Sequence, residues 1–175
     1  KSDTYIDTFS NINTPTQVSL HAANGEHIMW LAENAVTAEH PVAPFFNDLV
    51  SPEFGSLTAD DGKTDLFYKL YKPNNMQPGK KYPVIVSVYG GPHAQRVKNN
   101  WQGADITQFM LQQGYIVYQL DNRGSYNRGK KFEDAIYKHL GVVEVADQIK
   151  GVEFLRTLDY VDPARIGIYG HSYGG

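Results

Sequence analysis

The sequence predicts an α/β fold in which a mostly parallel sheet follows a short set of antiparallel strands. Two nearly continuous apolar runs, Tyr82–Tyr89 and Tyr115–Leu120, suit strands that are buried on both faces. Segments with a helical spacing of apolar residues separate these runs from each other and from a third strand, Arg165–Tyr169. The order strand, helix, strand, helix, strand is typical of a parallel sheet with right-handed crossovers.

Residues 1–34 predict the antiparallel part. Gln17–Ala22 alternates polar and apolar residues, and His27–Ala32 returns as an apolar strand. Asn24-Gly25 supplies two residues that tolerate positive φ in a tight turn between them. A lone hairpin is marginally stable in water, so we expect these strands to belong to a larger sheet. Residues 35–51 contain two prolines and predict a connector or a short irregular helix.

A second hairpin is predicted after Pro52. Its strands are Phe54–Thr58 and Thr64–Tyr71, and its turn contains Asp60-Asp61-Gly62-Lys63. A polar loop then leads into the first buried strand. This hairpin is expected to join the same domain as the parallel strands.

Two helices are predicted between the parallel strands. The first ends at Gly114, a residue suited to a helix C-cap. The second is longer and amphipathic, and its predicted apolar stripe consists of Val145, Ile149, Val152, Leu155 and Leu158. Asp162-Pro163 is expected to turn the chain before the last strand.

The composition excludes several classes of function. The net charge of −3, from 16 basic and 19 acidic residues, gives no reason to expect nucleic acid or an anionic membrane as a partner. No apolar run approaches the ~18 residues that a membrane-spanning helix needs. Cysteine is absent, and the six histidines show no metal-ligand spacing, so we expect no metal and no cofactor.

Residues Gly170–Gly174 read Gly-His-Ser-Tyr-Gly and match the pattern G-x-S-x-G. The motif follows a predicted strand and would open a helix, as the nucleophile elbow does in α/β-hydrolases. The serine of such an elbow lies on a sharp, strained turn, so its neighbours must lack bulk. Gly170, Gly174 and Gly175 meet this demand. The alternative is a glycine-rich turn with an incidental serine.

A serine nucleophile of this class also needs an oxyanion hole, built partly by the loop after an earlier strand. The buried run that ends at Tyr89 is followed by Gly90-Gly91-Pro92-His93. Two kinds of donor are available there: the Tyr89 hydroxyl and an N–H group of the glycine pair. The alternative is a tight Gly-Gly-Pro turn without a chemical role.

Four motifs occur in order: Val88-Tyr-Gly-Gly-Pro92, Leu120-Asp-Asn-Arg-Gly-Ser125, Leu140-Gly-Val-Val-Glu-Val-Ala-Asp-Gln148 and Arg165–Gly175. Together they resemble the catalytic domain of the prolyl oligopeptidase family, most closely its dipeptidyl peptidase IV branch. The resemblance implies an incomplete α/β-hydrolase domain over residues 52–175. Residues 1–34 resemble the closing blade of the β-propeller that precedes this domain in the family, with residues 35–51 as the connector.

The resemblance implies roles for three residues. Ser172 would be the acylated nucleophile. The backbone N–H of Tyr173 and the hydroxyl of Tyr89 would stabilise the tetrahedral oxyanion. The Tyr173 ring would line a small apolar pocket for proline or alanine at the penultimate substrate position, although the residues alone also allow a simple packed aromatic side chain.

Other polar residues near these motifs are interpreted as structural. Asp121 and Arg123 follow a strand end, where catalytic groups often lie, but we expect Arg123 to pin a loop by hydrogen bonds or an ion pair. The alternative is direct contact of either residue with substrate. His171 occupies the variable position of the elbow, so its side chain should point away from the reaction centre.

The triad of α/β-hydrolases runs in the order Ser, then Asp or Glu, then His. We therefore expect both partners of Ser172 beyond Gly175, and we expect the 175 residues to be part of a longer protein. Alone they should be inactive, because nothing in them is placed to take the serine proton. The last strand, Arg165–Tyr169, would then lie on an open sheet edge.

The resemblance implies that the whole protein is a serine peptidase that removes N-terminal dipeptides with proline or alanine in the second position. The alternatives within enzymes are an acylaminoacyl peptidase, an oligopeptidase or an esterase of the same fold. The alternative outside enzymes is a catalytically silent hydrolase-like binding domain. The expected partner is a peptide substrate, a homodimer stays open, and a periplasmic or secreted location is suggested by the resemblance alone.

Overall fold

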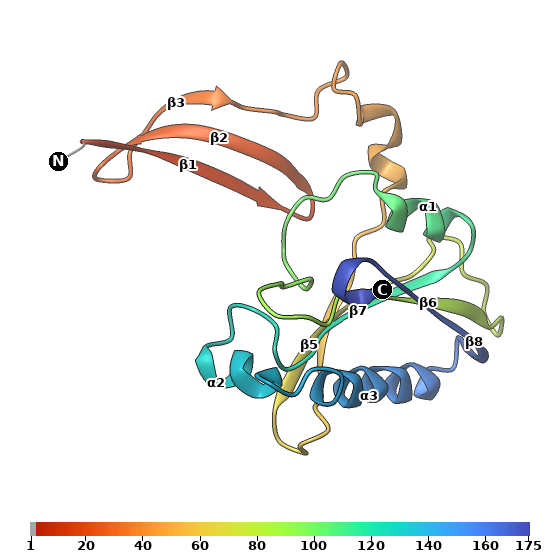
Figure 1. Cartoon of the computed structure of the whole chain (residues 1–175). Coiled ribbons are helices and arrows are strands. Elements are labelled where there is room, and N and C mark those ends of the chain that lie inside the picture. Colours follow the sequence, from red (N-terminus) through yellow and green to blue (C-terminus); the bar gives the residue numbers. More distant parts are fainter. Residues whose placement is uncertain (1–2) are drawn as a thin grey trace. The chain divides into compact units, whose positions relative to one another are not determined.

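A computed structural model describes residues 3–175, which divide into two units (Figure 1). The first unit comprises the described residues up to Ser51 together with Asn99–Ile106. The second comprises Pro52–Lys98 and Thr107–Gly175.

The first unit contains a three-stranded antiparallel sheet in the order β1-β2-β3, with β1 at Thr4–Asn11, β2 at Thr14–Ala22 and β3 at His27–Ala32. This confirms the predicted antiparallel strands. The outer strands expose large apolar side chains, among them Ile6 and Met29. Such side chains suit a sheet that packs against further strands, and the assignment to a propeller blade stays a prediction.

The connector after this sheet forms a short 3₁₀ helix, η1, at Ala43–Asp48. It has a proline in its first turn, a position where the missing N–H group costs no hydrogen bond. Phe46 on this helix stacks on Trp101, with ring centroids 6.1 Å apart. The prediction of a short irregular helix in residues 35–51 is therefore confirmed.

The second unit is built on a five-stranded sheet in the order β4-β5-β7-β6-β8. Its strands are β4 (Glu53–Thr58), β5 (Asp65–Tyr71), β6 (Tyr82–Val88), β7 (Ile116–Asp121) and β8 (Val161–Gly170). The three strands β7, β6 and β8 are parallel, as predicted, and β4 and β5 extend the sheet antiparallel from β7. The sheet is therefore mixed, and β6 and β7 form its buried centre.

The helices of this unit are α1 (Ile106–Gln112), α2 (Lys130–Glu133), which continues into the 3₁₀ helix η2 (Asp134–Ile136), and α3 (Val143–Thr157). The chain leaves α1 through Gly114 at a φ of +84°, which confirms the predicted C-cap. The longest helix, α3, runs along one face of the sheet (Figure 1). Gly151 allows this packing, because a Cβ there would lie 3.0 Å from both Leu120 and Tyr118 on β7.

The buried face of α3 matches the predicted apolar stripe only in part. Leu155 is fully buried, and Val152 and Leu158 pack against the core, but Val145 and Ile149 are 48% and 52% exposed. The helix also buries Glu144, Asp147 and Gly151, which the stripe did not include. The two carboxylates can take these positions because other residues of the same unit donate hydrogen bonds to them.

Strand β8 begins at Val161, earlier than predicted. Asp162-Pro163, which was expected to form a turn before the strand, lies inside it. The pairing with β6 shifts there, because Tyr82 pairs with Val161 whereas Val84 pairs with Ile166. Asp162 closes this irregular stretch by accepting a hydrogen bond from the backbone N–H of Ala164. The predicted turn is therefore a bulge within an edge strand, and Ile168 beyond it is 74% exposed.

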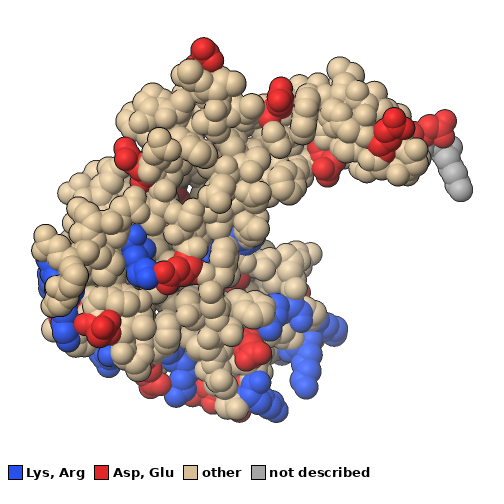
Figure 2. Space-filling model, turned by 180° about the vertical axis from the view of Figure 1, so that it is seen from behind, with Lys and Arg blue, Asp and Glu red and all other residues tan. Residues whose placement is uncertain are grey.

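The two units differ in charge. Residues 3–51 and 99–106 contain acidic side chains but no lysine or arginine, whereas the second unit carries both signs, interspersed on the face seen in Figure 2. None of the helices in residues 3–175 has both the length and the apolarity required to cross a membrane.

Candidate active site

Strand β8 ends at Gly170 and leads through His171 into a single 3₁₀ turn, η3, at Ser172–Gly174. Ser172 has a φ of +58°, in the left-handed region that residues with a Cβ rarely adopt. Its side chain is exposed. The chain therefore holds the serine hydroxyl outward on a strained turn at the end of a parallel strand, as the motif predicts.

The glycines around Ser172 permit this turn. A Cβ on Gly170 would overlap the backbone of Gly174, and a Cβ on Gly174 would overlap the carbonyl of Val88 at the end of β6. The turn therefore folds back tightly on β8 and against the neighbouring strand. Side chains at these two positions would force the elbow open.

The parallel pairing of β6 with β8 brings the predicted oxyanion loop to the elbow. Val88 pairs with Gly170, so Tyr89 and Ser172 follow the carboxyl ends of adjacent strands. The rings of Tyr89 and Tyr173 lie 6.0 Å apart at 44°. A Cβ on Gly91 would lie 2.5 Å from Cγ of Tyr173, so this loop needs a glycine for its close approach to the ring. The three predicted site residues thus share one edge of the sheet, and their chemical roles stay predictions.

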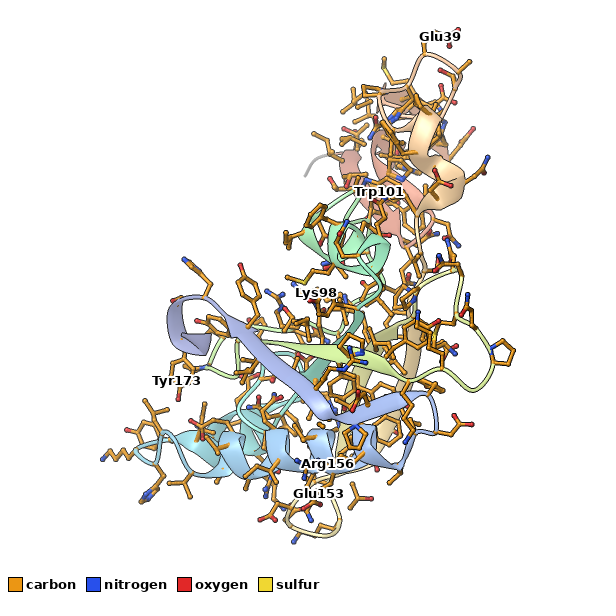
Figure 3. The ribbon with its side chains drawn as sticks, turned by 90° about the vertical axis from the view of Figure 1, so that its right-hand side faces the viewer. Glu39, Lys98, Trp101, Glu153, Arg156 and Tyr173 are labelled. Atoms are coloured by element: carbon orange, nitrogen blue, oxygen red, sulfur yellow. The ribbon has the colours of Figure 1, made fainter. Side chains whose placement is uncertain are left out.

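Tyr173 is tied to helix α3. Its hydroxyl donates a hydrogen bond of 2.5 Å to Oε1 of Glu144, and Figure 3 shows Tyr173 at the end of β8. Burial, together with this bond to a carboxylate, raises the pKa of Tyr173 to about 12. Burial acts to raise the pKa of Glu144 as well, but the hydrogen bonds from Gly141 and Tyr173 outweigh it and lower that pKa. The pair is therefore a neutral phenol bonded to an ionised carboxylate around neutral pH.

The loop after β6 is hydrogen-bonded to Asn122, which is fully buried. The Asn122 amide donates to the carbonyl of Gly90 at 2.9 Å and accepts from Nε2 of Gln148 at 2.9 Å. Gly90 has a φ of +73°, a backbone conformation outside the regular strand. Its carbonyl therefore needs a hydrogen-bond donor other than a neighbouring strand. Asn122 supplies that partner.

A cavity of about 520 Å³ lies between α3 and the sheet, and both Tyr89 and Tyr173 contribute to its wall. Most of its lining is apolar and comes from the middle of α3 and β8, including Ile149 and Ile168. It therefore belongs to the interface between helix and sheet. The pocket that the resemblance implies for the Tyr173 ring stays a prediction.

Asp121 and Arg123 have structural partners, as predicted. Both carboxylate oxygens of Asp121 accept backbone N–H groups, from Arg96 at 2.7 Å and from Val97 at 3.0 Å. The Arg123 guanidinium binds Asp147 at 2.7 and 2.9 Å and Asp61 at 3.2 Å. Arg123 thereby pins the β4–β5 turn to α3, and the prediction that it holds a loop is confirmed.

Among residues 3–175, no hydrogen bond joins the Ser172 hydroxyl to a side chain that could act as a base. Within the same residues, no group of three or more His, Asp or Glu side chains is arranged to hold a metal ion.

Ser172 lies at positive φ on a glycine-lined turn after a parallel strand, beside the loop of the neighbouring strand. This geometry is that of the nucleophile elbow in the α/β-hydrolase class, and the nucleophile role itself stays a prediction. The comparisons with known proteins then narrow the class. A model of the prolyl oligopeptidase family matches residues 101–175. The chain belongs to this family, in its dipeptidyl peptidase IV-like branch.

Three relatives illustrate the similarity. Dipeptidyl peptidase 8 of Mus musculus is 37% identical over 179 residues, which cover 99% of this chain and 20% of that protein. Prolyl endopeptidase FAP of Mus musculus is 39% identical over 115 residues, or 66% of this chain and 15% of that protein. A crystal structure from Bacteroides ovatus, of a protein assigned as a dipeptidyl aminopeptidase IV, has a TM-score of 0.86 and 46% identity. The match covers 98% of this chain and 24% of that one. The chain therefore spans about a quarter or less of the length of each of these three relatives.

Sequence reasoning assigned no role to Glu144, Asn122 and Gln148, although all three lie in motifs that carried the resemblance. Glu144, Asp147 and Gln148 have the i, i+3, i+4 spacing of one helix face. That polar spacing is a signal that this face of α3 meets hydrogen-bonding partners. A stripe defined by apolar residues alone does not take it into account.

Proposed function

We propose that the protein containing this chain is a serine peptidase that removes N-terminal dipeptides with proline or alanine in the second position. The observation that carries the proposal is the exposed Ser172 at a φ of +58°, on an elbow beside Tyr89. The dipeptidyl peptidase names of the relatives support the substrate class. We further propose that residues 52–175 form part of a hydrolase domain, with residues 1–34 from a propeller blade and residues 35–51 as the connector.

In the proposed reaction, Ser172 Oγ forms a bond to the carbonyl carbon of the substrate's second residue, and the C=O double bond becomes the single bond of an oxyanion. Its proton passes to a base contributed by residues outside 3–175. The Tyr89 hydroxyl and the Tyr173 N–H donate hydrogen bonds to the oxyanion. The C–N bond then breaks, the amine leaves with the proton, and water hydrolyses the acyl-enzyme. Since the base lies outside the described residues, residues 1–175 alone should not turn over substrate.

A second candidate is an endopeptidase or acyl-peptidase on the same site. The similarity to a prolyl endopeptidase favours keeping it, because the elbow and the oxyanion loop serve either activity. Turnover of Gly-Pro-p-nitroanilide by the full-length protein, compared with the N-acetylated substrate, separates the two. We expect the free amino terminus to be preferred, and preference for the acetylated substrate would favour the second candidate.

The role of Tyr89 is tested by Tyr89→Phe in the full-length protein. Loss of one oxyanion donor lowers kcat by about 10²–10³ in comparable enzymes. Tyr115→Phe is the matched control. Tyr115 is a partly exposed tyrosine just before the amino end of β7, whereas Tyr89 follows the carboxyl end of the parallel strand β6. Unchanged turnover of Tyr89→Phe would move the donor role to a backbone N–H of Gly90 or Gly91.

A further inference from the structure

We propose that helix α3 positions both sides of the oxyanion hole, through Glu144 on the Tyr173 side and through Gln148 and Asn122 on the Tyr89 side. The inference rests on the proposed function, because it concerns where that site holds its donors. None of the three residues needs to touch substrate. They act as positioning residues.

The first contact fixes Tyr173. Glu144 is 4% exposed, and its Oε1 accepts both the Tyr173 hydroxyl and the Gly141 N–H at 2.5 Å. Hydrogen bonds to a carboxylate are short and strong compared with neutral ones. The ring of Tyr173 is also confined on its flank by Gly91. With its tip bonded and its flank confined, the side chain sets the orientation of the Tyr173 backbone, which carries the proposed N–H donor.

The carboxylate of Glu144 is hydrogen-bonded through one of its two oxygens. Its second oxygen, Oε2, is buried and has no hydrogen-bond partner among the described residues. A buried polar atom without a partner destabilises a fold unless a gain elsewhere offsets it. Keeping a carboxylate under the elbow therefore favours a role at Tyr173 over a purely structural one.

The second contact fixes the loop after β6. Gln148 Nε2 donates to Asn122 Oδ1, and Asn122 Nδ2 donates to the Gly90 carbonyl, both at 2.9 Å. The peptide between Gly90 and Gly91 is planar and trans, so its N–H points opposite to its carbonyl. Because the carbonyl is held on Asn122, the Gly91 N–H faces away from that residue. This contact thus fixes the plane of the Gly90–Gly91 peptide, one residue after Tyr89.

Both contacts are linked to helix α3, the first directly and the second through Asn122 in the loop after β7. Glu144 and Gln148 are four residues apart, so they lie one turn apart on the same face of α3. The loops that they hold follow β8 and β6, which are adjacent in the sheet. A single helix therefore sets the separation between the Tyr173 side and the Tyr89 side of the site.

The test uses the full-length protein and the variants Glu144→Gln, Tyr173→Phe and their double mutant. Glu144→Gln keeps the size of the side chain but removes its charge, and we expect kcat to fall about fivefold to tenfold with KM unchanged. In the Tyr173→Phe background the same change should have no further effect, because the bonded hydroxyl is already absent. Glu153→Gln, an exposed carboxylate of α3 paired with Lys150, is the control and should leave kcat unchanged.

The second contact is tested by Gln148→Met, with Lys150→Met on the exposed side of α3 as its control. We expect kcat to fall about tenfold in Gln148→Met, with KM unchanged, because the oxyanion forms only in the transition state. If Gln148→Met does not fold, the Glu144 and Tyr173 cycle decides alone.

The inference is overturned if Glu144→Gln lowers kcat equally in both backgrounds, or if Glu144→Gln and Gln148→Met match their controls. All variants are assayed on an activated ester as well as on Gly-Pro-p-nitroanilide. Ester turnover needs Ser172, its base and the oxyanion hole but no recognition of a dipeptide, so a wrong dipeptide specificity would leave the test intact. A wild-type protein without any turnover would instead contradict the proposed function.

Discussion

Helix α3 buries two carboxylates three residues apart, and their surroundings differ. Asp147 is fully buried, and its oxygens accept hydrogen bonds from the Asp60 N–H, the Arg123 N–H and the Arg123 guanidinium. Glu144 is nearly as buried, but among residues 3–175 it has no basic partner and its Oε2 has no hydrogen bond. Its side-chain partner is the hydroxyl of Tyr173.

The difference indicates that Asp147 stabilises the fold, whereas Glu144 positions a residue of the proposed site. Asp147 joins α3, the β4–β5 turn and the loop after β7, and its charge is balanced by Arg123. Glu144 joins α3 to the elbow through Tyr173 and to the segment before the helix through Gly141, and its Oε2 has no partner among the described residues. Loss of Asp147 should therefore reduce stability first, and loss of Glu144 should reduce turnover first.

The largest effect in this comparison is expected for Asp147→Ala. Removing Asp147 leaves Arg123 with only its contact to Asp61 at 3.2 Å, and loss of one partner of a buried ion pair destabilises proteins by about 3–5 kcal/mol. Urea unfolding of the full-length protein, followed by a probe in the second unit, measures the change. Glu153→Ala breaks only an exposed pair and should change the free energy of unfolding by about 0.5 kcal/mol or less. Equal effects of the two variants would remove the distinction on which the comparison rests.

A smaller effect is expected for Gly91→Ala, which pushes on the ring that Glu144 holds. The new Cβ would lie 2.5 Å from Cγ of Tyr173, and forcing an extra methyl group into such a contact costs about 1–3 kcal/mol. We expect a lower kcat as the ring leaves Glu144. Gly167→Ala is the control, because its Cβ would meet Ile85 at an ordinary 3.7 Å.

Partial rescue of Gly91→Ala by Tyr173→Leu, measured as restored thermal stability, would identify the ring as the obstacle. A melting temperature of Gly91→Ala equal to that of Gly167→Ala would contradict the close approach between the loop and the ring.

The smallest effect is expected in the pH dependence of stability. The folded-state pKa of Glu144 lies below its ordinary value of 4.5, so its contribution is present above about pH 4.5 and is lost as the pH falls through the folded value. The pKa of Tyr173 is raised to about 12 from 10.0, so its contribution is present below pH 10 and is lost between about pH 10 and 12. The difference in unfolding free energy between the wild type and Glu144→Gln should therefore be constant near neutral pH and shrink below about pH 4.5. A difference that grows on acidification would contradict this sign.

Much of the fold follows from local patterns in the sequence. The apolar runs at Tyr82–Tyr89 and Tyr115–Leu120 become the buried strands β6 and β7, because continuous apolar character matches a strand covered on both faces. The Gly-His-Ser-Tyr-Gly motif predicts the sharp turn at Ser172, because that backbone needs glycines on both sides. These features depend on residues close together in the sequence, so contacts with distant residues change them little.

The parts that sequence reasoning missed depend on distant contacts. The polar part of the buried face of α3 escapes prediction, because Asp147 looks like a surface residue until Arg123, 24 positions away, is placed against it. Glu144 and Asn122 contact the site through partners 29 and 32 residues away, Tyr173 and Gly90. Periodicity weighs apolar residues and cannot show which polar residue will meet a partner.

The central claim is that Ser172 is a nucleophile held out on its elbow. The most direct test is to treat the full-length protein with a fluorophosphonate probe and to locate the adduct by mass spectrometry. The account predicts near-complete labelling of Ser172, no labelling of Ser172→Ala, and very slow labelling of residues 1–175 alone. An active full-length protein in which Ser172 stays unmodified, or in which the adduct forms on another serine, would contradict it.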